Sequence, residues 1–414
     1  MTLVGQGLDR RLRVLILTKV FPNSVNQHSS AFNRQQFLAL SRLCEVNILA
    51  LIPWFPGAHL FSARSEAGRS CVVPARETID GLDVLHPRAF FFPRFGYSAN
   101  PLTFALSLLP AVWPFRKKVD VILGSWAFPD GIAAIQLGHW FRLPVVVKVH
   151  GSDLNVFTEN GRIRRVLSRK LPRADRLVAV SRPLAARAQE LGVPSDRIAV
   201  VQNGVDRSLF SPSDRMEARR ALNLPDGRLI LYVGRLESAK GVLDLLDAFG
   251  RIASGSPKLR LALVGSGSEM PRCQEAVAKW PGRVFVPGAQ PLAQVGQWTA
   301  ACDILTLPSW NEGTPNVVLE ALASGRRVVA TQVGGIPDVL CSTDLGEMVP
   351  PRRPDLLAEA LVRVVHSSYD PLTIAAAGPP SWESSAHLLH QVLQSACDAS
   401  ALPDEVRMPH ALAS

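Results

Sequence analysis

The sequence lacks any uninterrupted apolar run of about 18 residues, the length of helix that crosses a lipid bilayer. We therefore expect no membrane-spanning helix among its 414 residues. Residues 1–20 carry charge before an apolar run, but residues 14–17 of that run have only strand length, and no small-residue cleavage site follows. The amino terminus is expected to hold the first buried strand rather than a signal peptide, in a protein that is soluble or peripheral.

Cysteine is also scarce. The six cysteines are scattered, and no two of them form a Cys-x-x-Cys pair, so the sequence predicts neither a zinc site nor a disulfide framework. Reduced thiols and a cytoplasmic location are the default expectation. An Asp-x-Asp metal motif and recognisable nucleic-acid motifs are missing too. The net charge of +10, from 45 Lys and Arg against 35 Asp and Glu, therefore favours anionic lipid or phosphate-bearing substrates over nucleic acid as partners.

Hydrophobic residues make up 47% of the sequence, which is enough for two domains to bury a core each. Apolar runs of strand length alternate with loops and helical patterns, and this alternation predicts an α/β fold. We place the first domain at residues 1–210 and the second at residues 211–378, with a polar, proline-bearing linker near the boundary. A closing helix is expected at residues 379–400 and a frayed tail at residues 401–414.

Residues 309–338 form the most informative stretch. They follow an apolar run of strand length at residues 304–307. The loop that contains Gly313 leads to Thr314 and Pro315, a threonine that can cap a helix and a proline that suits the first helical position. The sequence then predicts a helix, a second apolar strand and a second glycine loop.

A strand, a glycine loop and a helix start together form an anion-binding site. The backbone N–H groups of Asn316 and Val317 would have no partner within the helix and are expected to point at a bound phosphate. Glu312 in the loop, and Glu320 on the helix face of Asn316, can then reach hydroxyl groups on either side of the phosphates. A sugar nucleotide has such groups on its hexose and its ribose. Two isolated glutamates at this spacing would be interpreted as solvated surface charges. The surrounding strands, glycine loops and helix start favour a binding site instead.

This stretch resembles glycosyltransferase family 4, a large family of retaining enzymes. The resemblance rests on Glu312 and Glu320 with seven residues between them, followed by Ala-Leu-Ala-Ser-Gly, an apolar strand and Gly-Gly-Ile-Pro. It implies the GT-B fold: two Rossmann-like doubly wound domains that face a central cleft, with the carboxy-terminal helix crossing back to the first domain. It also implies that Glu320 holds the ribose of the donor and that Glu312 lies beside the donor sugar.

A second motif, Gly-Arg-Leu followed by Lys-Gly, begins at the end of a predicted strand at residues 228–233. Arg235 and Lys240, two cations at a strand end and a helix start, can neutralise a pyrophosphate. The family resemblance implies that they bind the donor phosphates and stabilise the leaving nucleoside diphosphate. Gly234 and Gly265 each follow a predicted strand, on the expected nucleotide face. The expected donor-binding residues are Gly234, Arg235, Lys240, Gly265, Glu312, Gly313, Thr314, Asn316, Val317 and Glu320.

His150 follows a predicted strand at residues 144–149, and ligands of open α/β sheets gather outside the carboxyl ends of strands. A lone histidine is more often structural. His-Gly-Ser-Asp, however, resembles the first-domain motif of the family, whose histidine contacts the donor sugar, and we carry this role to His150. We assign Asp153 to the acceptor side, together with Asn23 in a loop that resembles the family members with a Phe-Pro-Asn sequence. The expected catalytic residues are His150, Arg235, Lys240 and Glu312.

Residues 90–118 mix aromatic residues, leucines and a basic end. Pro101, Pro110 and Pro114 interrupt the segment, so it is not expected to form one long helix. One interpretation is core and interdomain packing, and the other is an amphipathic face that dips into a membrane near the acceptor lipid. Residues 162–176 carry seven basic residues against a single acidic one, which suits either anionic lipid or a solvated helix face.

We therefore predict a retaining hexosyltransferase that uses a UDP-, GDP- or ADP-sugar and a glycan or lipid-linked acceptor, in surface polysaccharide assembly. The family resemblance favours front-face attack, with the diphosphate taking the proton of the acceptor. No cofactor or metal is expected, because the Asp-x-Asp motif is missing. The expected location is the cytoplasm or the inner face of the plasma membrane. Three alternatives stay open: another GT-B enzyme such as an epimerase or phosphorylase, a non-catalytic nucleotide-sugar-binding module, and a membrane scaffold. The base, the sugar and the acceptor are not specified.

Overall fold

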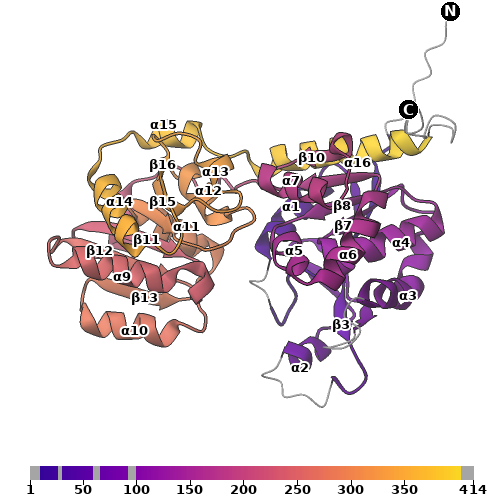
Figure 1. The fold of residues 1–414 in the computed structure, drawn as a ribbon, viewed down its shortest axis with the longest axis horizontal. Helices are drawn as coiled ribbons and strands as arrows, with labels where there is room; N and C mark the ends of the chain where they lie inside the picture. Colours follow the sequence, from indigo (N-terminus) through magenta and orange to yellow (C-terminus); the bar gives the residue numbers. More distant parts are fainter. Residues whose placement is uncertain (1–9, 27–29, 59–65, 92–98, 402–414) are drawn as a thin grey trace, which may run out of the picture. The chain divides into compact units, whose positions relative to one another are not determined.

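The chain folds into two compact units (Figure 1), seen in a computed structural model that describes residues 10–26, 30–58, 66–91 and 99–401. The first unit takes in Met1–Val180, Leu184–Val201 and Glu383–Ser414, and the second takes in Ser181–Pro183 and Gln202–Trp382. The second unit therefore begins ahead of the boundary expected at 210–211. The reason is that Val205 and Phe210 are buried in the core of the second unit.

The first unit is built on a sheet of eight strands in the order β10-β9-β8-β7-β1-β2-β5-β4. All neighbours in this sheet pair in parallel except β4, which is antiparallel to β5. The strands are β1 (Arg13–Thr18), β2 (Glu45–Ala50), β4 (Arg76–Ile79), β5 (Leu82–Leu85), β7 (Val121–Ser125), β8 (Val145–Val149), β9 (Arg176–Ala179) and β10 (Ile198–Val200). A separate parallel pair joins β3 (Ile52–Trp54) to β6 (Arg88–Phe90).

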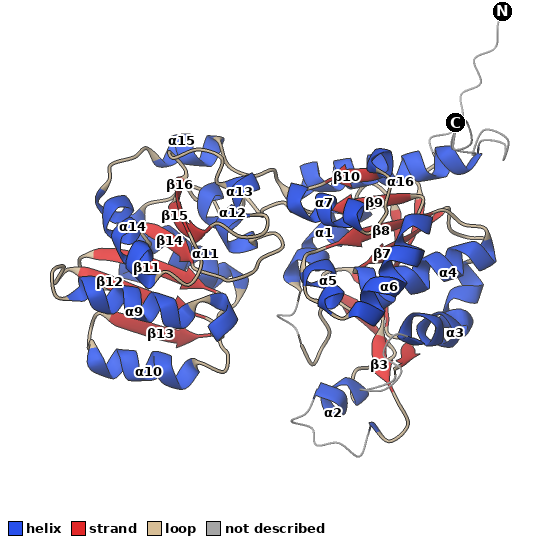
Figure 2. Cartoon of the chain, in the orientation of Figure 1, coloured by secondary structure: helices blue, strands red, loops and turns tan. Residues whose placement is uncertain are grey.

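The second unit has a six-stranded parallel sheet in the order β13-β12-β11-β14-β15-β16. Its strands are β11 (Arg228–Val233), β12 (Leu259–Val264), β13 (Val284–Gly288), β14 (Ile304–Leu307), β15 (Arg327–Thr331) and β16 (Gly346–Val349). This order, 3-2-1-4-5-6 in sequence, is that of the dinucleotide-binding doubly wound fold. Helices flank both sheets (Figure 2), and the predicted Rossmann-like character of both domains is confirmed.

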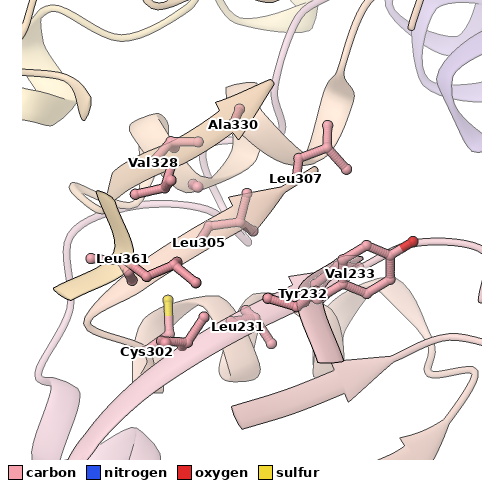
Figure 3. Close-up of a cluster of buried hydrophobic side chains, with 14 of the residues drawn as sticks. Leu231, Tyr232, Val233, Cys302, Leu305, Leu307, Val328, Ala330 and Leu361 are labelled. Carbon is pink, nitrogen blue, oxygen red and sulfur yellow. The ribbon is translucent and has the colours of Figure 1, made fainter. Parts of the chain in front are cut away.

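The hydrophobic core of the second unit explains why its strands are continuous apolar runs in the sequence. Parallel strands covered on both faces bury almost every side chain. In Figure 3, side chains of β11, β14 and β15 lie close together, with Leu361 and Cys302 beside them. The sequence predicts apolar strands at residues 13–18, 228–233, 259–264, 304–307 and 327–331, and β1, β11, β12, β14 and β15 have these bounds.

The helices that lie wholly or mainly in the first unit are α1 (Ala31–Ser41), α2 (Glu66–Cys71), α3 (Asn100–Val112), α4 (Ile132–Phe141), α5 (Ser152–Asn155), α6 (Gly161–Lys170), α7 (Arg182–Glu190) and α16 (Trp382–Ala401). The helices of the second unit are α8 (Arg215–Ala221), α9 (Val242–Ala253), α10 (Met270–Lys279), α11 (Leu292–Ala301), α12 (Asn316–Ala323), α13 (Ile336–Val339), α14 (Pro354–His366) and α15 (Pro371–Ala376). In the described part of the chain, no helix is both long and apolar enough to cross a membrane.

Helix α16 follows the second unit in sequence but belongs to the first unit from Glu383 onward. Gln36 of α1 donates a hydrogen bond to the Ser385 hydroxyl at 3.2 Å, and Arg42 forms an ion pair with Glu383 at 2.8 Å. Nearer its end, the Cys397 thiol lies 3.7 Å from the carbonyl oxygen of Asp120. The expected return of this helix to the first domain is therefore confirmed.

Segment 90–118 differs in detail from the expectation. Residues 92–98 lie outside the described residues, and α3 then runs through Pro110 to Val112. Pro110 does not end the helix because, within its last turn, the missing N–H removes a single helical hydrogen bond. A short helical turn, η3 (Trp113–Phe115), follows and contains Pro114.

Candidate active site

The candidate donor site lies where the strand order of the second sheet reverses. Strands β12 and β13 extend the sheet on one side of β11, and β14 to β16 extend it on the other. In open α/β sheets, ligands bind outside the carboxyl ends of the two strands that flank this switch point. The loops at 234–241 and 308–315 leave the carboxyl ends of β11 and β14, and they contain most of the predicted donor-binding residues.

Lys240 and Glu312 meet between these two loops. The Lys240 Nζ atom donates to Glu312 Oε1 at 2.7 Å, and the two side chains are 21% and 12% exposed. Trp310 holds the loops together: its backbone N–H donates to the Ala239 carbonyl at 3.0 Å, and its indole N–H donates to Asp244 Oδ2 at 2.8 Å. The sequence predicted both charged residues but not their pairing.

Two glycines allow the loop backbones to approach. Gly265 has a φ of +149°, and a Cβ atom there would lie 1.8 Å from the Gly234 carbonyl oxygen. A Cβ atom on Gly334, whose φ is +54°, would lie 1.8 Å from the carbonyl oxygen of Glu312. Any side chain at these two positions would therefore push the loops apart, because both contacts are with backbone atoms.

The structure at the start of α12 differs from the expected anion site in two respects. The helix begins at Asn316 after Pro315, and no side chain caps it, so the predicted Thr314 cap is wrong. The Asn316 N–H donates to the Thr314 carbonyl at 3.0 Å, so the expectation of an unpaired N–H is wrong at this residue. The turn before the helix has satisfied this donor locally. Within the described residues, the Val317 N–H forms no hydrogen bond, and it remains the one predicted donor available to an anion.

The Asn316 side chain also has a partner. Its Oδ1 atom accepts a hydrogen bond from Asn203 Nδ2 at 2.9 Å. This bond fixes the side chain at the helix start and ties α12 to the segment that opens the second unit.

Arg235 and Glu320 are placed differently from the central pair. The Arg235 guanidinium pairs with Glu237 at 2.9 Å, and its side chain is 68% exposed. Tyr232 fixes the backbone there by donating from its hydroxyl to the Arg235 carbonyl at 2.7 Å. Glu320 lies within α12, and burial raises its pKa to about 7. The residue is only partly buried, and it forms no ion pair with a described residue that would offset the desolvation of its charge.

His150 lies beside the corresponding switch point of the first sheet. That sheet reverses its order between β1 and β7, and His150 follows β8, the neighbour of β7. Its ring packs 5.0 Å from that of Phe32 and stacks on that of Trp126 at 6.0 Å. Its Nε2 atom lies 2.9 Å from the Ser125 hydroxyl.

The hydrogen bonds around His150 determine its tautomer. Asn33 Nδ2 donates to the Val20 carbonyl at 2.7 Å, so the Asn33 Oδ1 atom faces Ser125 and accepts from its hydroxyl at 3.2 Å. The Ser125 oxygen must then accept from His150, which places the proton on Nε2 and a lone pair on Nδ1. Burial lowers the pKa of His150 well below its ordinary value, and nearby Lys148 adds to this. The His150 Nδ1 atom is buried without a hydrogen-bond partner in the described part of the chain.

Asp153 is not placed to meet an acceptor. Its side chain is fully buried, and its carboxylate accepts from the backbone N–H groups of Ala127 at 2.9 Å, His150 at 3.0 Å and Gly151 at 2.7 Å. Asp153 therefore holds the His150 loop in place and presents no carboxylate oxygen to a substrate. Asn23 likewise uses its side chain locally, where Oδ1 accepts from the N–H groups of Val25 at 3.1 Å and Asn26 at 2.9 Å.

Trp126 is the residue that sequence reasoning missed. Its φ of +127° is rare for a residue with a side chain, and its indole N–H is buried with no partner among the described residues. The Lys19 ammonium lies 5.7 Å from its ring centroid. Strained residues of this kind cluster at functional sites. The sequence could have indicated a functional position here, because Trp126 directly follows β7 at the carboxyl end of the strand.

In the ranges that the structure describes, no three His, Cys, Asp or Glu side chains gather as a metal site requires. All six cysteines are free thiols. The arrangement offers the Lys240–Glu312 pair at the switch point of the second sheet and the neutral, oriented imidazole of His150 in the first unit. These are groups that bind phosphate and hydroxyl groups.

The comparisons with known proteins define the class. Residues 58–209 match the model described as Glycosyltransferase Family 4, and residues 227–367 match the model described as Glycosyl transferases group 1. A Bacillus subtilis (strain 168) protein named as a candidate teichuronic acid biosynthesis glycosyltransferase, TuaC, is 30% identical over 362 residues, which is 86% of this chain and 90% of that protein. The D-inositol 3-phosphate glycosyltransferase of Nocardioides sp. is 29% identical over 334 residues, 73% of each protein.

Solved structures agree on the fold. Sucrose-phosphate synthase from Thermosynechococcus elongatus superimposes with a TM-score of 0.71 at 21% identity, covering 94% of this chain and all of that one. Anabaena HepE, solved in complex with UDP, gives a TM-score of 0.68 at 18% identity over 93% of this chain and all of that one. The fold is therefore GT-B, and the protein is a glycosyltransferase. The chain belongs to glycosyltransferase family 4.

Proposed function

We propose that this glycosyltransferase takes a hexose-type sugar from a nucleotide-diphospho-sugar and transfers it with retention of configuration. The observation that carries the proposal is the Lys240–Glu312 pair, 2.7 Å apart at the switch point of the second sheet. A cation there can meet the diphosphate that gains negative charge, and the adjacent carboxylate can meet the sugar that gains positive charge. The Val317 N–H at the start of α12, for which the described residues offer no acceptor, adds a donor for phosphate oxygen.

In the proposed reaction, one bond to the anomeric carbon forms while another breaks on the same face of the sugar. The oxygen of the acceptor hydroxyl bonds to this carbon as its bond to the diphosphate breaks, and the hydroxyl proton passes to the departing diphosphate. Lys240 and Arg235 stabilise the diphosphate, Glu312 orients the sugar, and Glu320 holds the ribose. Attack and departure on the same face would give retention without a covalent enzyme intermediate, which is the route that the family resemblance favours.

For the donor, the acceptor and the location we propose classes rather than single molecules or sites. UDP is the first nucleotide to test, because the Anabaena structure contains it, and GDP- and ADP-sugars are the alternatives. We propose a glycan or lipid-linked acceptor of surface polysaccharide assembly, since the Bacillus subtilis relative is named for teichuronic acid biosynthesis. We also propose catalysis without metal or cofactor, in the cytoplasm or on the inner face of the plasma membrane.

The donor proposal is tested in two stages. A thermal-shift panel of UDP-, GDP- and ADP-sugars identifies the nucleotide that stabilises the folded chain. The chosen donor is then incubated with candidate acceptors, and the linkage of the product is read by nuclear magnetic resonance. An α-linked product from an α-linked donor supports the proposal, and a β-linked product contradicts retention.

The same product analysis decides between the alternatives. An epimerase would return an altered nucleotide sugar, and a phosphorylase would need inorganic phosphate. A binding module would show a thermal shift with neither transfer nor donor hydrolysis. Glu312→Gln serves as the matched variant in each assay, because it keeps the shape of the side chain and removes its charge.

We further propose that His150 contacts the transferred sugar through Nδ1, the nitrogen that its bond with Ser125 leaves without a proton. A sugar hydroxyl would donate to this atom. His150→Ala is expected to lower transfer while leaving the affinity for free UDP within about twofold, since the lost contact is a single hydrogen bond to the sugar. Full transfer by this variant would remove His150 from the site.

A further inference from the structure

One face of the first unit carries large apolar side chains that point away from the core of the unit and remain exposed. Helix α3 has no charged residue. Its core-facing side chains are buried, but Leu102 and Leu106 are each 51% exposed, and Trp113 in η3 is 55% exposed. Together with Leu109, they follow a spacing of four, three and four residues, which lines one side of a helix. A helix that is apolar all round is normally covered on every side, so α3 has a second face without a partner in the described residues.

This second face forms one wall of a groove. Figure 2 shows α3 and α4 at one edge of the first unit, and the two helices are in contact. The groove between them has a volume of about 430 Å³. Its apolar lining comes from α3, η3 and the end of α4, where Trp140 is 38% exposed. The rings of Trp113 and Phe141 meet edge to face at 6.0 Å, which fixes the shape of this end.

The rim of the groove is basic. Arg116 and Lys117 line it, and Lys118 is exposed next to them. The Arg116 guanidinium lies 4.1 Å from the Trp113 ring centroid and donates to the Trp113 carbonyl at 2.8 Å, so it is held over the apolar surface. Within the described residues, none of these three cations forms a salt bridge with a carboxylate. The nearest acid in sequence, Asp120, is already paired with Arg13 at 2.6 Å.

We propose that this face, made by Leu102, Leu106, Trp113, Trp140, Arg116 and Lys117, docks the protein onto an anionic lipid leaflet. The leucine and tryptophan side chains enter the boundary between headgroups and acyl chains, and the cations meet lipid phosphates. Tryptophan favours this depth because its ring is apolar and its N–H needs a polar partner. The inference deepens the proposed function, since a leaflet of this kind would also hold a lipid-linked acceptor.

The charge distribution decides against the other occupants. A second copy of the chain would bring two sets of unpaired cations face to face, and like charges at an interface oppose association. An apolar peptide would fill the groove but leave the basic rim without a partner. An anionic leaflet satisfies both parts of the surface at once, because it offers phosphate oxygens beside hydrocarbon.

The test is flotation of the full-length protein with vesicles. Vesicles of phosphatidylcholine with about one third phosphatidylglycerol are compared with pure phosphatidylcholine vesicles, at low and high salt. We expect binding to the anionic vesicles, weakened by salt. Each cation removed from the rim should lower the partition coefficient about fivefold, so K117Q/K118Q should lower it by more than tenfold. L106S/W113S should lower it by at least tenfold, because two inserted side chains are lost.

Matched controls come from the second unit. Leu372 is 67% exposed and Lys258 is exposed, so L372S and K258Q remove the same kinds of side chain elsewhere and should float as the unmodified protein does. Brominated lipid should quench tryptophan fluorescence in the unmodified protein and less in W113L. Transfer to a water-soluble acceptor should be unchanged in all four flotation variants, because none of their substitutions touches the proposed donor site.

The outcomes separate this inference from the proposed function. Unchanged flotation of L106S/W113S and K117Q/K118Q would overturn the docking face, even if the protein binds vesicles through another surface. Binding of neutral and anionic vesicles alike, or a concentration-dependent dimer abolished by L106S/W113S, would overturn it too. If the unmodified protein floated as expected but showed no transfer with any donor and acceptor, the proposed function would be contradicted and the docking face would still be supported.

Discussion

Replacing Glu320 by glutamine should remove the pH dependence of donor binding. Burial raises the pKa of Glu320 to about 7, and the proposed contacts to the ribose hydroxyl groups need the ionised carboxylate, which accepts two hydrogen bonds. One pH unit below its pKa a carboxyl group is about one tenth ionised. Affinity for the donor should therefore fall roughly tenfold between pH 8 and pH 6 in the unmodified protein. In Glu320→Gln it should be constant over this range and about 10- to 100-fold weaker at pH 8, because charge-assisted hydrogen bonds are lost.

The same variant should be more stable than the unmodified protein when no ligand is bound. The pKa of Glu320 is higher in the folded chain than the ordinary value of 4.5, so the folded state holds a proton that the unfolded state has released. Stability then falls as pH rises from about 4.5 to about 7. Above pH 7 the partly buried charge costs at most about 3 kcal/mol, and glutamine avoids this cost. The gain should disappear at pH 4.

Calorimetric titration with UDP-glucose at pH 6, 7 and 8 measures the first effect. If thermal shifts select another donor, that nucleotide sugar replaces it. A nucleotide sugar is preferable to a free nucleotide because its phosphates do not titrate in this range. Urea unfolding at pH 4 and pH 8 measures the second effect. Glu275→Gln, at a position that is 64% exposed, is the matched control. The reasoning would be refuted if donor affinity of the unmodified protein did not change with pH, or if Glu320→Gln kept the same slope.

Three further predictions concern other parts of the molecule. Asp303 is buried and accepts from three arginines and the Leu229 N–H, so Asp303→Asn should lower the free energy of unfolding by about 3–5 kcal/mol in urea titrations; a loss under about 1 kcal/mol would contradict this. Asn33→Leu frees the Ser125 hydroxyl to donate, so ¹⁵N spectra of labelled histidine should show the His150 proton moving from Nε2 toward Nδ1; an unchanged spectrum would refute the hydrogen-bond order. Transfer should persist in excess EDTA; activity lost there and restored by Mg²⁺ would disprove metal independence.

The sequence predicts the sheets well because of how parallel strands are buried. Five strands match their predicted bounds, since a strand covered on both faces is a continuous apolar run with sharp ends. The residues that follow those strands could be named for the same reason: Lys240, Glu312 and His150 all lie in or beside loops at strand carboxyl ends. What these residues contact could not be read, because Lys240 meets Glu312 across 72 positions of sequence.

Local geometry was the less predictable part. Thr314 and Pro315 suggest a capped helix start, but α12 begins one residue later, at Asn316, and Pro315 takes the N-cap position. Asp153 looks like a free carboxylate in sequence and is used entirely by backbone N–H groups of its own loop and the one after β7. Trp126 carries no sequence signal of strain, since its φ follows from the packing around it. Such choices are made by tertiary contacts rather than by local preference.

The central claim is that Lys240 binds the donor diphosphate and exchanges Glu312 for phosphate when the donor arrives. Titration of UDP into two variants tests it directly, because the expected effects have opposite signs. Lys240→Met should weaken UDP binding about 10- to 100-fold, since it removes a charged donor to phosphate. Glu312→Gln should bind UDP as tightly as the unmodified protein or a few fold more tightly, since it frees Lys240 from its partner in the ligand-free chain, while transfer is lost. Equal weakening by both substitutions, or UDP affinity unchanged in Lys240→Met with both variants folded, would contradict the account.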